Sequence, residues 1–151
     1  MAVSTKLPGW LEELTDEYNK RISHWAKAET LLIQSPKVSR DGAEIKTKAE
    51  AELILRKIEP GDFLVLCDEK GKTFSTLAFS SQLEKILNRS AKRVVFLIGG
   101  AYGVENSIRD RADLVLSLSA LTFNHQLALA ILSEQVYRAF TVLKGVRYHN
   151  E

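Results

Sequence analysis

The sequence predicts an α/β fold in which a mostly parallel β-sheet carries helices on both faces. Segments with helical and strand-like patterns alternate along the whole chain, and this alternation is typical of parallel sheets. The segments 63–67 and 94–98 are apolar at every position, as expected for strands that are covered on both faces. Because no repeat, low-complexity tract or linker divides the chain, we expect residues 1–151 to form a single domain.

Apolar side chains that recur at steps of three and four predict the helices. The predicted helices span residues 8–26, 43–58, about 76–87, 104–111 and 125–144. Residues with known capping preferences support their ends. Pro8 suits the first turn of the first helix, Ser75 or Thr76 suits the start of the third, and Gly145 suits the end of the last.

Short apolar runs rich in branched residues predict the strands. The predicted strands span residues 30–34, 63–67, 94–98 and 114–116. A polar loop is expected over 35–42 and a turn over 68–71, while Gly99 and Gly100 end the third of these strands abruptly.

Composition excludes several classes of protein. Hydrophobic residues make up 45% and charged residues 26% of the chain, which is typical of soluble globular proteins. The net charge of +2 is compatible with nucleic-acid binding but does not argue for it. No apolar run approaches the roughly 20 residues of a membrane span, and no apolar leader precedes Pro8. We therefore expect a cytoplasmic protein without a membrane partner.

Cysteine and histidine usage argues against disulfide and metal chemistry. The single cysteine, Cys67, excludes an internal disulfide and a cysteine-based zinc cluster. Its place in an apolar strand favours a buried structural thiol over a nucleophile. The spacing of the histidines and carboxylates suggests no metal site, so we expect no metal.

The last predicted helix is apolar around most of its circumference. Such a helix must be covered on most sides, and one small sheet covers only one of them. A second copy of the chain is an economical cover, so we favour a homodimer. The alternative is a deeply packed core helix in a monomer.

Ligands of parallel sheets bind beyond the carboxyl ends of the strands, and three loops leave those ends here. The glycine-rich loop 99–103 matches neither the dinucleotide-binding nor the P-loop pattern, which argues against NAD and ATP. The loop 117–124 could wrap a ligand and offer backbone groups to an adenine edge. The more common role of such a loop is a packed connection, with Thr122 or Asn124 capping the next helix.

Several segments together resemble a known family. They are 95–103, 116–126, 134–140 and the tail Tyr148-His149, which resemble the ribosomal RNA large subunit methyltransferase H family of small SPOUT-class enzymes. The resemblance extends over nearly the whole chain. It implies an α/β fold with a C-terminal trefoil knot, a homodimer, and methyl transfer from S-adenosylmethionine to N3 of a pseudouridine in 23S rRNA, within the large subunit or the assembled ribosome.

The resemblance also implies roles for particular residues. By motif, the cofactor-binding residues are Cys67, Gly99, Leu118, Ser119, Ala120, Leu121, Thr122 and Phe123. Most of these contacts are expected to run through the backbone. Arg138, Tyr148 and His149 match residues on the side of the target base. We expect Arg138 to orient the base or stabilise its developing anion, and Tyr148 and His149 to close the pocket.

The sequence departs from the family pattern at several positions. The first strand is reduced to Ala2-Val3, as a late start or a shortened edge strand would give. Cys67 replaces a common leucine, Asn124 a usual proline and Leu129 a usual arginine. These changes leave two alternatives open: a non-catalytic RNA- or ribosome-binding protein of the same fold, and a related methyltransferase with a different RNA target.

Overall fold

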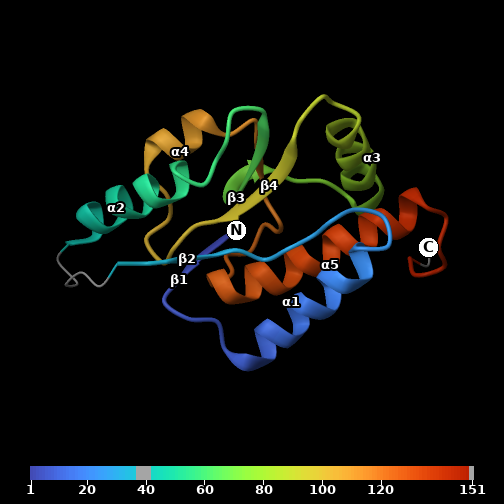
Figure 1. The fold of residues 1–151 in the computed structure, drawn as a ribbon, viewed down its shortest axis with the longest axis horizontal. Helices are drawn as coiled ribbons and strands as arrows, with labels where there is room; N and C mark the ends of the chain where they lie inside the picture. Colours follow the sequence, from blue (N-terminus) through green and yellow to red (C-terminus); the bar gives the residue numbers. More distant parts are fainter. Residues whose placement is uncertain (37–41, 150–151) are drawn as a thin grey trace.

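A computed structural model describes residues 1–36 and 42–149 and has a five-stranded sheet at its centre (Figure 1). The strands lie in the order β2-β1-β4-β3-β5, and every pair is parallel. The strands are β1 (Ala2–Ser4), β2 (Leu32–Gln34), β3 (Asp62–Lys72), β4 (Arg93–Ile98) and β5 (Leu114–Leu116). The helices are α1 (Gly9–Ile22), α2 (Ala43–Leu55), α3 (Thr76–Leu87), α4 (Asn106–Arg111) and α5 (His125–Leu143). This architecture confirms the predicted α/β fold, whereas the trefoil knot stays a prediction.

Successive residues of the central strands enter hydrophobic cores on opposite faces of the sheet. Leu64 of β3 packs in one core with Ile54 of α2 and Ile108 of α4. Its neighbour Val65 packs in another core with residues of α3 and with Phe140 of α5. The continuous apolarity of these strands therefore reflects helices on both faces. On the second face, α1 and α5 lie side by side (Figure 1).

The helix caps predicted from the sequence are confirmed. The Ser75 hydroxyl accepts a hydrogen bond from the backbone N–H of Ala78 at 3.3 Å, which satisfies a free donor at the start of α3. Gly145 follows α5 with φ +65°, a left-handed conformation that glycine adopts without strain. The helix predicted over 8–26 is shorter than expected, because the chain leaves the helical path after Ile22.

The turn predicted over 68–71 is wrong, because β3 continues through this segment. Leu116 of β5 pairs with both Cys67 and Lys72, so the residues between them bulge out of the ladder. A Cβ atom at Gly71 would lie 2.6 Å from the backbone carbonyl carbon of Leu116. The glycine is thus required by a close backbone crossing and not by a turn.

Of the two explanations left open for the short first strand, a shortened edge strand is wrong. β1 pairs with β2 along its whole length and with β4 through Ala2 and Ile98. It therefore lies inside the sheet, whose edges are β2 and β5. Among the helices that the structure describes, none combines the length and apolarity of a membrane span.

Candidate functional site

The carboxyl ends of β3, β4 and β5 meet at one edge of the sheet. Cys67 lies opposite Ile98 on one side and opposite Leu116 on the other. Gly99 follows β4 directly, and the loop 117–124 follows β5 directly. The two predicted cofactor-binding segments, Gly99 and the loop 118–123, therefore start close to Cys67. They lie beyond the carboxyl ends of parallel strands, which is where open parallel sheets bind ligands.

The loop between β5 and α5 presents free backbone groups. The Ser117 hydroxyl donates to the carbonyl oxygen of Ser119 at 2.9 Å, and the Leu121 N–H donates to the Ser119 hydroxyl at 2.9 Å. These two contacts hold the loop in a turn. Within the described parts of the chain, the backbone of residues 118–123 forms no hydrogen bond with other backbone groups. The loop thus keeps donors and acceptors that fit a ligand held through the main chain.

The glycine-rich loop after β4 is compact. The Gly103 N–H donates to the Gly100 carbonyl at 3.1 Å, and Gly103 adopts φ +78°. A Cβ atom at Gly99 would lie 2.6 Å from Cγ1 of Val104 and 3.2 Å from the Gly103 oxygen. The absence of a side chain at Gly99 therefore lets Val104 and Gly103 pack directly against the backbone where β4 ends.

Side chains of the extended part of β3 anchor the site, and sequence reasoning did not assign them a role. Arg109 of α4 donates to Asp68 at 2.5 Å. Burial, the largest single effect, raises the pKa of the Asp68 carboxyl, but the hydrogen bonds from Arg109 and from the Lys70 N–H and the charges of Arg109 and Lys70 together hold that pKa below its usual value. Thr122 donates from its hydroxyl to the Glu69 carboxylate at 2.6 Å. The only sequence signal for a role of Asp68 and Glu69 was their position directly after the apolar run 63–67.

A second cluster of side chains joins the end of α5 to the C-terminal segment. Arg138 donates from Nη1 to His149 Nδ1 at 3.2 Å, and its guanidinium lies 4.8 Å from the centre of the Tyr148 ring. The structure therefore brings together the three residues predicted for the target side. Tyr148 also packs edge-on against Tyr137, with ring centroids 4.8 Å apart. Tyr148 and His149 thus pack onto α5 and are not solvated.

Glu134 belongs to this cluster, although sequence reasoning gave it no role. Its Oε1 accepts hydrogen bonds from Arg138 Nε at 2.9 Å, Arg138 Nη2 at 2.5 Å and the Tyr148 hydroxyl at 3.2 Å. Burial, followed by the neighbouring Tyr18, raises the pKa of Tyr148 to about 12. The phenol is therefore protonated at neutral pH and acts as a donor. The sequence signal for this contact was the four-residue spacing of Glu134 and Arg138 on one helix, at which oppositely charged side chains can pair.

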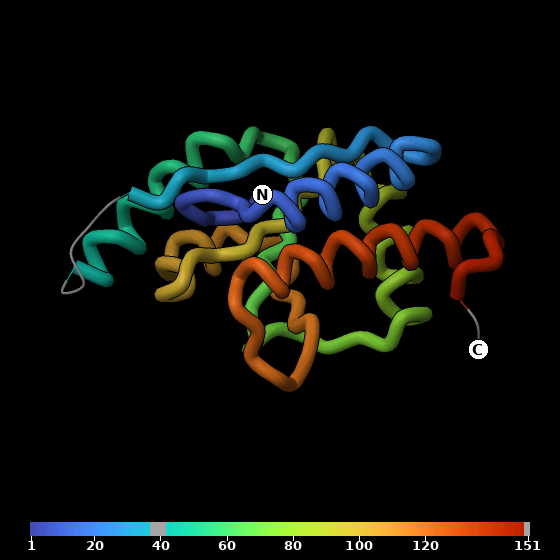
Figure 2. The backbone as a smooth tube through the Cα atoms, turned by 90° about the horizontal axis from the view of Figure 1, so that it is seen from below, coloured from blue at the N-terminus to red at the C-terminus, as the bar shows by residue number. Residues whose placement is uncertain are grey.

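The two groups of site residues lie at opposite ends of α5 (Figure 2). The loop 117–124 precedes His125 at the start of the helix, whereas Arg138 lies more than three turns further on. A rise of about 1.5 Å per residue separates them by about 20 Å along the helix axis. Within one chain, the structure does not bring the cofactor loop and the Arg138 cluster together.

Comparison with known proteins identifies the family. A family model described as predicted SPOUT methyltransferase matches residues 1–149. The chain belongs to the SPOUT methyltransferase family. Membership makes it a methyltransferase, with S-adenosylmethionine as its methyl donor. The resemblance inferred from the sequence is therefore confirmed.

Relatives of this SPOUT methyltransferase match over nearly their whole length. A protein from Bdellovibrio bacteriovorus named Ribosomal RNA large subunit methyltransferase H is 40% identical over 98% of this chain and 95% of its own. A protein of the same name from Parabacteroides distasonis is 42% identical over 95% of this chain and 92% of its own.

One solved structure shares the fold. It is the structure of a probable methylase family protein from Haemophilus influenzae Rd KW20, with a TM-score of 0.52 and 11% sequence identity. The match covers 95% of this chain, which spans 65% of that protein's length. At this identity the likeness concerns the fold alone.

Residues at which this SPOUT methyltransferase departs from the family pattern have structural roles. Asn124 is the N-cap of α5, since its side-chain oxygen accepts from the N–H groups of Gln126 at 3.0 Å and Leu127 at 2.9 Å. Leu129 is buried in a core with residues of α1 and β1. Burial raises the pKa of the Cys67 thiol to about 12, so this thiol stays protonated, as predicted for a structural cysteine.

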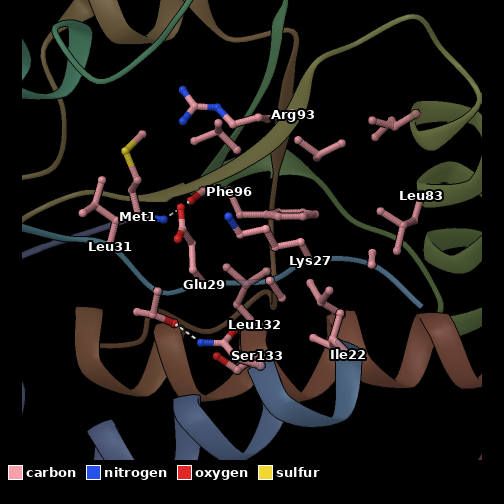
Figure 3. Close-up of a pocket in the computed structure, with 18 of the residues that line it drawn as sticks. Met1, Ile22, Lys27, Glu29, Leu31, Leu83, Arg93, Phe96, Leu132 and Ser133 are labelled. Carbon is pink, nitrogen blue, oxygen red and sulfur yellow. Dashed lines mark hydrogen bonds between the residues drawn. The ribbon is translucent and has the colours of Figure 1, made fainter. Parts of the chain in front are cut away.

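A cavity of the methyltransferase lies away from both groups of site residues. It has a volume of about 620 Å³ and is bordered by β4, α5, α3 and the segment 26–31. Figure 3 shows Phe96, Leu132 and Leu83 around it, with the Met1 amino group donating to the Phe96 carbonyl at 2.6 Å. None of the predicted site residues, all of which the structure describes, lines this cavity.

Proposed function

We propose that this chain transfers a methyl group from S-adenosylmethionine to N3 of a pseudouridine in 23S rRNA. Its substrate is the large subunit or the assembled ribosome in the cytoplasm, and the chain acts as a single domain. The names of relatives at 40% and 42% identity support the RNA substrate. The observation that carries the proposal is the convergence of Cys67, Gly99 and the loop 118–123, whose backbone forms no hydrogen bond with other backbone groups, at one sheet edge.

The residues at this edge fit the methyl donor. When bound, S-adenosylmethionine supplies a methyl group on a sulfonium centre, ready for direct displacement. The chain's own task is to align the reactants. Backbone groups of 118–123 would hold the adenine edge, Gly99 would admit the cofactor close to the main chain, and Cys67 would form the floor between them.

The cluster at the far end of α5 suits the RNA side of the reaction. Removal of the N3 proton leaves negative charge on the base, and the Arg138 guanidinium would stabilise this charge as it develops. Tyr148 packs against Arg138, and His149 accepts a hydrogen bond from it, so both would border the base pocket. These roles agree with those implied by the family motif.

The separation of the two groups favours a homodimer with shared sites. Methyl transfer requires the base and the cofactor to be in contact, whereas Arg138 lies about 20 Å along α5 from the loop that would hold the cofactor. A second copy would bring its own Arg138 cluster to the cofactor loop of the first. Each site of a two-fold dimer would then contain residues from both chains.

The proposal is tested by incubating the purified protein with ribosomes that lack the modification and with S-adenosylmethionine labelled in its methyl group. We expect label in 23S rRNA, mapped to N3 of a pseudouridine. Label at another nucleotide would favour a related methyltransferase with a different target. RNA or ribosome binding without transfer would favour a non-catalytic binding protein, and either result would overturn the proposal.

A further inference from the structure

We infer that Glu134 is a positioning residue, which fixes the orientation of the Arg138 guanidinium and the Tyr148 phenol toward the target base. This inference rests on the proposed function, because it concerns the RNA side of the same site. It assigns a role to a residue that lies in the motif 134–140 but to which the resemblance gave no role.

The hydrogen-bond geometry makes Glu134 the hub of the cluster. Arg138 uses both Nε and Nη2 on Glu134 Oε1, which fixes the plane of the guanidinium. The remaining nitrogen, Nη1, then points to His149 Nδ1. Since arginine only donates, this contact requires an unprotonated Nδ1 on His149. One carboxylate thus determines the arrangement of all three target-side residues.

Glu134 also fastens the C-terminal segment to the helix. The chain leaves α5 at Gly145, and the Tyr148 hydroxyl reaches back to Glu134 Oε1. The other oxygen, Oε2, accepts from Gln135 at 2.6 Å. The Tyr148 phenol, whose ring lies against Arg138, is consequently held at both its face and its hydroxyl.

Partial burial makes this ion pair different from the other helical pairs in the chain. The side chains of Glu134 and Arg138 are 21% and 26% exposed, whereas those of Glu44 and Lys48 on α2 are 82% and 62% exposed. Water screens a partly buried pair less strongly. An exposed pair such as Glu44–Lys48 contributes little, so it serves as a matched control.

The test compares methyl transfer to unmodified ribosomes by wild type, Glu134→Gln, Glu134→Asp and the control Glu44→Gln. The Gln variant keeps the shape of the side chain but loses its charge, and the Asp variant keeps the charge but is one methylene shorter. We expect kcat to fall by about 10- to 100-fold in both Glu134 variants. Cofactor affinity should stay within about twofold of wild type, because the Glu134 side chain bonds Arg138, Tyr148 and Gln135 and not the backbone of residues 118–123 that would hold the cofactor. The control should keep wild-type kcat.

Separate outcomes test the inference and the proposed function. If both Glu134 variants keep wild-type kcat, or if they lose only thermal stability, the positioning role is overturned while the proposed function stands. If one variant does not fold, the other gives the same comparison. If wild type itself transfers no methyl group to the ribosome, the proposed function fails, and the inference fails with it.

Discussion

Thr122 donates a hydrogen bond from its hydroxyl to the Glu69 carboxylate at 2.6 Å, across 53 positions of sequence. This contact joins the loop after β5 to the extended part of β3. β3 and β5 are neighbours in the sheet. The contact therefore sets the position of a loop whose backbone forms no hydrogen bond with other backbone groups.

Loss of this hydrogen bond is expected to weaken cofactor binding. Thr122→Val keeps the shape of the side chain and removes the donor, which costs about 0.5–1.5 kcal/mol of loop stabilisation. We expect the Kd for S-adenosylmethionine to rise by about two- to tenfold, measured by calorimetry. Thr47→Val removes a comparable hydroxyl contact on α2 and should leave the Kd unchanged. Equal Kd values in the two variants would contradict the anchoring role.

Because β3 and β5 cross closely at Gly71, we expect replacement of this glycine to lower the stability of the protein. A Cβ atom at Gly71 meets backbone atoms of Val115, Leu116 and Ser117 within 2.7 Å, and backbone cannot move aside as a flexible side chain does. Gly71→Ala should lower the free energy of unfolding by about 1–3 kcal/mol. Gly9→Ala meets no atom within 4 Å and should be neutral or slightly stabilising. Urea unfolding measures the free energy of unfolding of the two variants, and equal changes in both would disprove the close crossing at Gly71.

An ion pair between the buried Asp62, at the start of β3, and the half-exposed Arg93 predicts a pH dependence of stability. The Asp62 carboxylate is fully buried and accepts hydrogen bonds from Arg93 Nε at 2.9 Å and Nη2 at 2.6 Å. The hydrogen bonds from Arg93 hold the pKa of Asp62 below its ordinary value of 3.8. Because the folded pKa is the lower one, this stabilisation is present above pH 3.8 and is lost as the pH falls through the folded pKa.

Asp62→Asn is therefore expected to be most destabilising at neutral pH. The variant should lose about 1.5–3 kcal/mol of unfolding free energy at pH 7, the contribution of hydrogen bonds to a charged group. The difference from wild type should shrink as the pH falls below 3.8. Denaturant unfolding of both proteins at several pH values measures this difference in unfolding free energy. A difference that is constant with pH would show that the charge of Asp62 is not responsible.

Shared sites in a homodimer predict complementation between two inactive variants. Arg138→Ala removes the target side and should abolish transfer while leaving cofactor affinity nearly unchanged. Gly99→Val should prevent cofactor binding, because its side chain would overlap Val104 and the Gly103 backbone and so displace the loop 99–103 that borders the cofactor site. Co-expressed copies with different tags should recover about a quarter of wild-type activity, since half the dimers are mixed and each mixed dimer has one intact site.

The control for complementation is each variant purified alone, folded by circular dichroism and inactive. Mixed dimers isolated through both tags but still inactive would show that each site lies within one chain. The same outcome would contradict the shared site while leaving the methyltransferase activity itself untouched.

Local patterns were sufficient to predict most of the fold. Helix periodicity and the apolar runs at 63–67 and 94–98 indicate buried parallel strands, because burial on both faces leaves a direct mark on composition. The continuation of β3 could not be predicted in this way. The polar segment after Cys67 has the composition of a turn, and only its pairing with β5 makes it a strand. Strand order, including the interior position of β1, is likewise a property of tertiary packing.

The site could be predicted only in part, for a related reason. Backbone contacts impose few demands on side chains, so the loop 118–123 leaves little trace in composition and was assigned through the family motif. The link between Glu134 and Tyr148 depends on the turn at Gly145, which folds the tail back onto α5. Sequence spacing shows the pairing of Glu134 with Arg138 but not this third member.

The central claim is tested most directly by titrating the purified protein with S-adenosylmethionine in a calorimeter. We expect saturable binding with a stoichiometry of about one site per chain or per dimer, and we expect Gly99→Val to abolish it. Saturable binding that Gly99→Val abolishes would place the methyl donor at the edge formed by β3, β4 and β5. Undetectable binding to folded wild-type protein would contradict the account and favour a non-catalytic RNA-binding protein of this fold.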